Sequence, residues 1–322
     1  MTDLSDLHQQ NVCVSGRFAD WTKAELEILL KARGAWQVSA SPSKGVAAMI
    51  SAEATGPKVE KARALGVPVV GPDELRQALG PPLNGYLRRL NRKIAEQPSY
   101  VQRAVLAVGA PASDALLARV EQQIGFPLPA EAAALWRQLD GLSLLWTTPG
   151  LMPCSSEPLA WSEACHDGGP LWTRLHALRA ANPTRFWMGM VCIPPLETLF
   201  FTPWRGRIVP DHAVGPKDTV QLGRRKVAAQ ALTEHLYGFD LFSPFTFAGL
   251  WADQETQRLQ VVYGTDHGAD WSVAATVPLE VYLEFLLVDL GATRPIEPTR
   301  KVGWPSGIRR LAHLPWVELA PF

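Results

Sequence analysis

The chain has 322 residues, of which 47% are hydrophobic and 19% charged, a composition typical of globular proteins and not of disordered or collagen-like chains. Lysine plus arginine equals aspartate plus glutamate, at 31 each, so the molecule lacks the strong positive field expected of a general nucleic-acid coat. A chain of this length is expected to form two compact domains.

The even charge balance conceals a difference between the two halves of the chain. Residues 1–99 contain 13 basic and 10 acidic side chains, net +3, whereas residues 100–290 contain 13 basic and 19 acidic side chains, net −6. Because oppositely charged surfaces attract different molecules, we expect the two halves to meet different partners.

The sequence lacks the features of a secretory signal or a membrane span. The first residues, Met1 to Asp6, are acidic and have no apolar run behind them. The longest strongly apolar stretch, residues 186–196, is too short to cross a bilayer and contains Pro194-Pro195. The four cysteines show no CxxC spacing and are too few to crosslink a chain of this size. We therefore expect a cytoplasmic protein without membrane contact, whose thiols are buried or incidental.

Strand and helix signals alternate in the first eighty residues. A β-prone run at 11–15 ends at Gly16, and Thr22 with Glu25 forms a capping box for a helix that ends near Gly34. Further strands are predicted at 36–40, 47–50 and 67–70, and further helices at 57–65 and 72–79. This order predicts an α/β fold with a four-stranded, mainly parallel sheet and three helices that cover both faces.

Five separated landmarks in this part of the chain resemble BRCT domains, particularly those of bacterial NAD-dependent DNA ligases. They are Val14-Ser15-Gly16, Arg33-Gly34-Ala35, Gly56-Pro57-Lys58, Lys61-Ala62 and Leu65-Gly66-Val67. Leu75 stands where many BRCT domains have a tryptophan, which the ligase-like branch also often lacks. The resemblance covers about residues 9–80 and implies a BRCT-like domain over residues 1–82.

The resemblance also implies a phosphate-binding site. In phosphate-binding BRCT domains, a hydroxyl and a backbone N–H at the end of the first strand share an anion with a lysine at the start of the second helix. Ser15, Gly16 and Lys58 occupy these places. The combination is physically sound, because a hydroxyl, an amide, an ammonium and a helix N-terminus all favour a negative group. Alternatively, Ser15-Gly16 is only a turn and Lys58 a solvated residue, since glycine has backbone reasons to stand there.

Neighbouring loops extend this candidate patch at Arg17, Lys44 and Thr55. A domain with a net charge of +3 makes few phosphate contacts, so any DNA binding should be sensitive to salt and depend on an end or a modified group.

Residues 83–111 are predicted to be a basic linker helix and a linker. The segment from Tyr86 to Ile94 has the pattern of a short amphipathic helix, with Leu87, Leu90 and Ile94 together and the basic groups outside. The helix is either a phosphate-contacting arm or a solvated linker, and we favour the solvated linker.

Residues 112–322 are predicted to form a larger α+β domain. Ser113 is a good N-cap for a helix that ends at Gly125, and Pro129 begins a second helix. Strands are predicted at 258–263 and 271–277, followed by a helix from Pro278.

This part of the chain resembles the SUKH superfamily at its two ends, 112–146 and 258–290. The opening pattern is Val120-Glu121, Ile124-Gly125, Leu128-Pro129, Leu135 and Leu139-Asp140-Gly141. The superfamily includes a yeast cell-wall-synthesis regulator and many bacterial immunity proteins. Residues 147–257 are longer and richer in tryptophan and proline than the family pattern, which implies long insertions.

Ten of the twelve tryptophans lie beyond residue 100, and for most of them core packing is the expected role. Some could instead project from loops as interface anchors, because tryptophan is enriched in binding hot spots. The tryptophans in question are Trp146, Trp161, Trp172, Trp187, Trp204, Trp251 and Trp271.

The sequence contains no GxSxG, Walker loop, GxGxxG or HExxH motif. Asp211-His212 and Asp266-His267 with Asp270 are acid–histidine pairs without partners that would complete a site, and Cys165-His166 lacks a second ligand pair at zinc-like spacing. We predict no catalytic residue, no metal and no small-molecule cofactor.

Two functions follow as expectations. In the first, the chain is a non-enzymatic adaptor whose BRCT-like domain binds the phosphate of a DNA end or a phosphoprotein, while the SUKH-like domain binds a protein partner. In the alternative, it is a bacterial toxin-immunity protein whose acidic SUKH-like domain neutralises a cognate toxin. A third and weaker hypothesis is an enzyme that uses His267.

Overall fold

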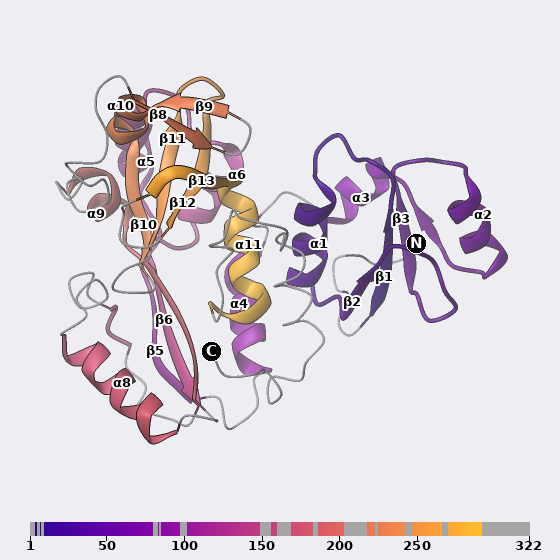
Figure 1. The fold of residues 1–322 in the computed structure, drawn as a ribbon, viewed down its shortest axis with the longest axis horizontal. Helices are drawn as coiled ribbons and strands as arrows, with labels where there is room; N and C mark the ends of the chain where they lie inside the picture. Colours follow the sequence, from indigo (N-terminus) through magenta and orange to yellow (C-terminus); the bar gives the residue numbers. More distant parts are fainter. Residues whose placement is uncertain are drawn as a thin grey trace.

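The computed structural model places a smaller N-terminal unit beside a larger α+β unit (Figure 1). It describes residues 4, 7, 10–79, 83, 85–96, 102–148, 156–159, 169–182, 186–202, 218–222, 225–241, 247–265 and 270–291. Within these ranges, none of the helices has both the length and the apolar character needed to cross a bilayer.

The N-terminal unit is a parallel sheet of four strands in the order β2-β1-β3-β4. Its elements are β1 (Asn11–Ser15), α1 (Lys23–Ala32), β2 (Gln37–Ser39), β3 (Ala48–Ser51), α2 (Pro57–Ala64), β4 (Val69–Val70) and α3 (Pro72–Leu79). The predicted α/β class and the order of its elements are confirmed.

Alternate residues of β1 belong to two different cores, because successive side chains of a strand point to opposite faces. Val12 and Val14 belong to a buried cluster with side chains of α1 and α3. Cys13 belongs to a second cluster with Val59 and Ala62 of α2. Helices α1 and α3 therefore cover one face and α2 the other (Figure 1), as the element order predicts.

Local sequence signals explain where α1 begins. The Glu25 N–H donates to Thr22 Oγ1 at 3.2 Å, and the Thr22 N–H donates to Glu25 Oε2 at 2.7 Å, which completes the predicted capping box. Leu75 of α3, at the place of the tryptophan that many BRCT domains have, is fully buried.

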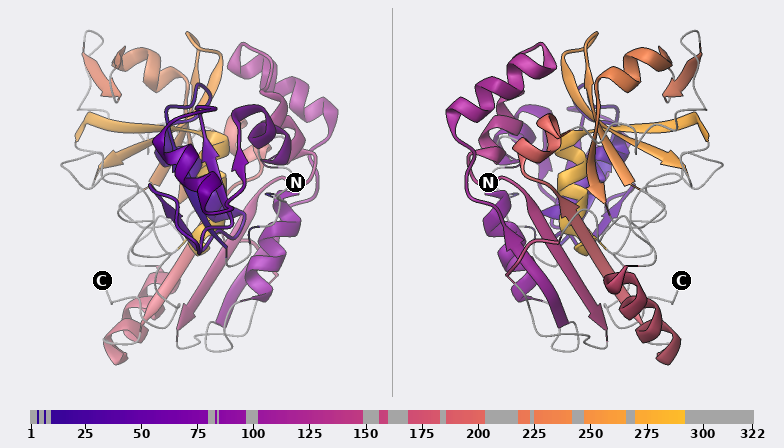
Figure 2. Two further views of the ribbon diagram at one scale, coloured as in Figure 1. Left: turned by 90° about the vertical axis from the view of Figure 1, so that its right-hand side faces the viewer. Right: turned by 90° about the vertical axis from the view of Figure 1, so that its left-hand side faces the viewer.

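The second unit has two largely antiparallel sheets, as the predicted α+β class requires: β5-β6-β7 and β10-β11-β12-β13-β8-β9. The first forms a long ribbon with α8 packed near one end (Figure 2). The elements from the connecting helix onward are α4 (Tyr86–Ala95), β5 (Gln102–Val108), α5 (Asp114–Ile124), α6 (Ala130–Trp136), β6 (Leu142–Thr148), α8 (Pro170–Ala181), β7 (Trp187–Ile193), α9 (Leu196–Phe201), β8 (Thr219–Leu222), β9 (Arg225–Ala228), α10 (Ala229–Glu234), β10 (Leu236–Leu241), β11 (Phe247–Asp253), β12 (Arg258–Thr265), β13 (Asp270–Pro278) and α11 (Leu279–Asp289).

Several predicted details of this unit are confirmed. Ser113 caps α5 by accepting a hydrogen bond from the Leu116 N–H at 3.2 Å, and Gly125 ends the helix at φ +85°. The side chains of Trp146, Trp172 and Trp251 are buried in the core. Those of Trp161, Trp187, Trp204 and Trp271 lie outside the described residues. Cys13 and Cys192 are buried thiols that are not joined in a disulfide, and Cys154 and Cys165 also lie outside the described part.

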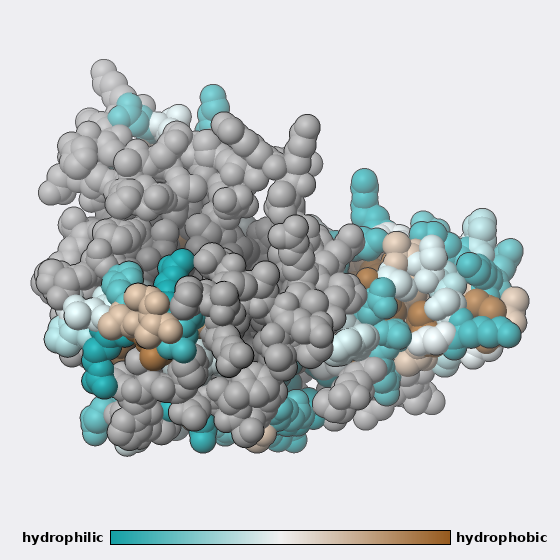
Figure 3. Space-filling model, turned by 60° about the horizontal axis from the view of Figure 1, so that its bottom comes forward, coloured by the Kyte–Doolittle hydropathy of each residue, from teal (hydrophilic) through white to brown (hydrophobic). Residues whose placement is uncertain are grey.

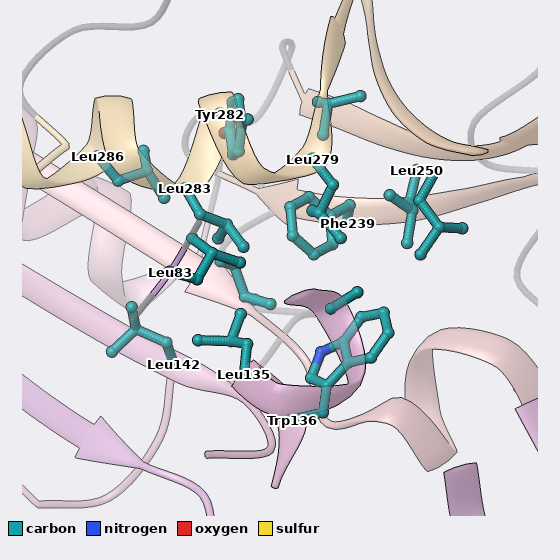
Figure 4. Close-up of a cluster of buried hydrophobic side chains, with 14 of the residues drawn as sticks. Leu83, Leu135, Trp136, Leu142, Phe239, Leu250, Leu279, Tyr282, Leu283 and Leu286 are labelled. Carbon is teal, nitrogen blue, oxygen red and sulfur yellow. The ribbon is translucent and has the colours of Figure 1, made fainter. Parts of the chain in front are cut away.

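Helix α11 joins the two units, because α1 packs against it. Ile28 and Ala32 of α1 belong to the large buried cluster of the second unit and not to the core of their own sheet. Leu83, just before α4, also belongs to this cluster and lies between Leu283 and Leu135 (Figure 4).

A buried ion triad lies at this junction. The Glu284 side chain is fully buried on α11 and accepts two hydrogen bonds from the Arg89 guanidinium of α4, at 2.5 and 2.6 Å. Arg33, which follows α1, places its Nη1 3.7 Å from the Glu284 carboxylate. The Leu83 N–H donates to the same carboxylate at 3.2 Å.

The prediction that α4 keeps its basic groups outside is therefore wrong at Arg89. Leu90 and Ile94 are buried as expected, but Arg89 is buried beside them, because Glu284 supplies the opposite charge that a buried guanidinium needs. Arg88, one residue earlier, is exposed. Helix α4 packs into the second unit and is not a solvated linker helix.

Candidate functional site

The predicted phosphate-binding residues lie at the carboxyl edge of the parallel sheet. Ser15 is the last residue of β1 and pairs with Ser51 at the end of β3. Ser15 shares its face of the strand with Cys13, which α2 covers. The Ala52 N–H donates to the Ser15 carbonyl at 3.0 Å, so the two strands remain close as they leave the sheet.

Gly16 has two structural reasons to be glycine. Its φ is +93°, a conformation that other residues rarely adopt, and a Cβ there would lie 2.7 Å from the Cβ of Ala52. Among the described residues, none accepts a hydrogen bond from the Gly16 N–H. This amide is therefore available to a ligand at the exposed end of β1.

We call the site formed by Ser15, Gly16 and Lys58 the corner, and its second wall is the loop from β3 to α2. The Ser51 hydroxyl donates to the Glu53 carbonyl at 2.8 Å, and Arg63 Nη2 donates to the Ala54 carbonyl at 3.2 Å, which fastens the loop to the helix. Gly56, the N-cap of α2, supplies no side-chain cap. Pro57 has no N–H and the Glu60 N–H donates to the Gly56 carbonyl, so the amides of Lys58 and Val59 are the ones left without intrahelical partners at the positive end of the helix.

Lys58 extends across the end of β1. Its Nζ donates to the Ala40 carbonyl at 2.8 Å, and Ala40 follows β2, which lies on the other side of β1 from β3. One of the three ammonium hydrogens is used in this contact, so two remain for an anion. Burial raises the pKa of the Cys13 thiol, whereas a hydrogen bond with Ser39 and the charges of Lys58, Lys23 and Lys61 lower it. These three lysines are therefore close to β1.

The other predicted contacts divide between the two edges of the sheet. Arg17 and Thr55 are exposed on the loops that follow β1 and β3, beside the corner. Lys44 is also exposed, but it lies in a turn just before Ala47, whose N–H donates to the carbonyl of Asn11 at the start of β1. Asn11 and Ser15 are four steps apart along the strand, a distance of roughly 13 Å.

Two basic residues that the sequence analysis did not assign complete the corner. Lys23 is the first residue of α1, and Lys61 lies one turn after Lys58 on α2, and both are exposed. The start of a helix that follows a parallel strand lies at the same edge as the end of that strand. That topological rule was the signal for Lys23.

The corner also contains a carboxylate. Glu53 is exposed, and its Oε2 lies 3.7 Å from the point where a Cβ on Gly56 would be. Asp20, in the β1–α1 loop, is paired with Arg76 of α3 at 2.6 Å. Glu53 therefore opposes the positive charges around the corner.

On the face drawn in Figure 3, hydrophobic colour on the described part of the N-terminal unit is limited to small areas among hydrophilic atoms. Trp36, immediately before the edge strand β2, is the one large hydrophobic side chain among the described residues that is exposed, at 44%. On the face drawn, the described surface of the N-terminal unit is thus mainly hydrophilic.

The acid–histidine and cysteine–histidine pairs weighed in the sequence lie outside the described residues. These pairs are Asp211-His212, Cys165-His166 and Asp266-His267. For Asp270, which was considered together with Asp266-His267, the structure describes the backbone alone, at the start of β13. Within the described ranges, no group of three or more His, Cys, Asp or Glu side chains is arranged to hold a metal ion.

A scan of the chain against protein-family models matches no family, and a search of the curated proteins finds no match either.

Proposed function

We propose that residues 1–82 form a BRCT-like domain that recognises a phosphate group, and that the chain acts as a non-enzymatic adaptor. The observation that supports this proposal is the combination, at one edge of the sheet, of a free Gly16 amide, an uncapped helix start and the ammonium of Lys58. Each of these donors favours an anion. The ligand is the phosphate of a DNA end or of a phosphorylated protein.

The second unit supplies the other half of this proposal, as a SUKH-like domain that binds a protein. The helix pair α5 and α6 and the order β12-β13-α11 agree with the two ends of the chain where the SUKH resemblance lies. The acid excess of residues 100–290, 19 acidic against 13 basic, equally fits the alternative in which this unit neutralises a basic toxin. Co-expression with a toxin encoded beside the gene tests that alternative.

Fluorescence anisotropy with 5′-phosphorylated and 5′-hydroxyl DNA duplexes, and with a phosphoserine peptide and its unphosphorylated form, tests phosphate recognition. We expect the parent chain to prefer a phosphorylated probe and the double variant Ser15→Ala, Lys58→Ala to bind it at least ten-fold more weakly. Hydrogen bonds to charged groups each contribute about 1.5–3 kcal/mol, which supports an effect of this size.

Two single variants serve as controls. Lys44→Ala removes the same charge at the other edge of the sheet and should leave phosphate-dependent binding unchanged. Glu53→Gln removes the opposing carboxylate and should strengthen binding up to about five-fold, the effect of a pair of charges ~4 Å apart in water. If the double variant binds the phosphorylated probe as tightly as the parent does, or if neither probe binds better than its unphosphorylated form, the proposal is wrong.

A further inference from the structure

A pocket of about 150 Å³ lies in the second unit where four segments meet. Leu83, Leu259 and Leu279 form apolar parts of its wall, and Glu131, Glu280 and Arg258 are its charged residues. They come from the segment before α4, from α6, from β12 and from the start of α11. An engineered apolar cavity of about 150 Å³ in another protein holds benzene, so a group of five or six heavy atoms fits.

The charged residues that line the pocket do not form ion pairs with one another within the described part of the chain. Within the described part of the chain, Glu131 and Arg258 form no ion pair and no side-chain hydrogen bond, and Glu280 accepts one only from its own backbone. Glu131 and Glu280 stand in the first turns of α6 and α11, where the helix dipole favours a negative charge. The helix dipole explains why Glu131 and Glu280 stand at helix starts. It does not explain the pocket with apolar walls that lies beside their carboxylates.

The balance of charge around the pocket is negative. Burial is the main reason that the pKa of Glu280 is raised, and the charges of Glu131 and of Glu25 on α1 add to it, while Arg258 opposes it. Three carboxylates thus act against one guanidinium. A second cation in the pocket would relieve this repulsion, since an opposite charge within ~4–6 Å favours the ionised carboxylate.

We propose that this pocket binds a short alkylguanidinium or alkylammonium group. The alkyl part packs against Leu83, Leu259 and Leu279, and the positive charge lies between Glu131 and Glu280. Long basic side chains bind in the same manner, with an apolar stem on apolar surface and the charged end beside carboxylates. The group is provided either by a free small amine or by an arginine or lysine of a partner protein. This inference does not depend on phosphate recognition by the N-terminal unit.

Isothermal titration calorimetry of the full chain with butylammonium chloride, whose five heavy atoms fit a pocket of this size, tests the proposal. A ligand of this size is expected to bind with a Kd of about 1 mM, given the affinity that each non-hydrogen atom of a small ligand contributes. Butanol, which has the alkyl part without the charge, should bind at least ten-fold more weakly. A peptide with one central arginine, compared with its citrulline form, distinguishes a partner's side chain from a free amine as the source.

Variants separate the pocket from a general effect of charge. Glu131→Gln and Glu280→Gln should each weaken binding of butylammonium at least five-fold, and Ala132→Leu, which fills the pocket from α6, should abolish it. Glu60→Gln removes an equal charge from the exposed face of α2 and should change nothing. Because the two glutamine variants keep the shape of the side chain, they remain informative if Ala132→Leu does not fold. Equal binding by the parent and the Glu131→Gln, Glu280→Gln double variant, or no binding of either the free ligand or the arginine peptide, would overturn the proposal.

Discussion

Replacing Glu284 by glutamine is expected to lower the free energy of unfolding by about 3–5 kcal/mol, the usual cost of breaking a buried ion pair. The substitution keeps the size of the side chain and removes its charge. Two arginines, Arg33 and Arg89, are then left buried at the junction of α1, α4 and α11 without a counter-ion. Urea denaturation followed by tryptophan fluorescence measures the loss.

The matched control is Glu197→Gln, which breaks the exposed pair between Glu197 and Arg119. A surface pair of this kind contributes about 0–1 kcal/mol, because water and salt screen it. If Glu284→Gln and Glu197→Gln lower the free energy of unfolding equally, the junction does not depend on the triad. Replacing all three members of the triad by apolar residues of similar volume should restore most of the loss, since no uncompensated charge then remains.

Trp146→Ala is expected to lower the free energy of unfolding by about 3–5 kcal/mol, the range for truncating a large aromatic side chain in a core. The Trp146 side chain is buried in β6, and its Nε1–H donates to the Leu290 carbonyl at 2.9 Å. The indole thus connects the ribbon β5-β6-β7 to the end of α11. Truncation leaves a cavity and also leaves this carbonyl without its donor. Thermal unfolding followed by circular dichroism measures the effect.

Trp36→Ala is the control for Trp146→Ala, because both substitutions remove an indole. Trp36 is 44% exposed, and exposed positions usually change the free energy of unfolding by no more than ~0.5 kcal/mol. A comparable loss in the two variants would contradict the assignment of Trp146 to the core, since removal of exposed surface would then cost as much as removal of buried surface.

The fold of the N-terminal unit could be predicted because its signals are local. The capping box at Thr22 and Glu25, the glycine turn after β1 and the proline at the start of α2 each indicate an element boundary within a few residues. Alternation of strand and helix then determines a parallel sheet, because a parallel pair needs a crossover connection.

Most of the strands of the second unit were not predicted, for a physical reason that β6 illustrates. All seven of its residues are buried, so the strand has no alternation of polar and apolar side chains that would distinguish it from a buried helix. The pairing of Arg89 with Glu284 could not be predicted from the sequence either, because the two residues are 195 positions apart and nothing local indicates their contact. Charge patterning alone favours exposure of a basic helix such as α4.

The candidate site was predictable in part. Ser15, Gly16 and Lys58 meet at one edge because the end of a strand and the start of the following helix share that edge in a parallel sheet. Lys44 does not join them, because the chain must return to the amino edge between two parallel strands, and Lys44 lies late in that return. The contact of Lys58 with the Ala40 carbonyl depends on the placement of β2 beside β1, which element order alone does not determine.

Amide chemical shifts test the central claim, that the carboxyl edge of the N-terminal sheet binds phosphate, most directly. In a titration of the ¹⁵N-labelled full chain with a 5′-phosphorylated oligonucleotide, we expect the resonances of Gly16 and Lys58 to shift and saturate, because their N–H groups have no acceptor among the described residues. The 5′-hydroxyl oligonucleotide should leave both in place. Saturable shifts confined to other residues, or equal shifts with the two oligonucleotides, would contradict the account.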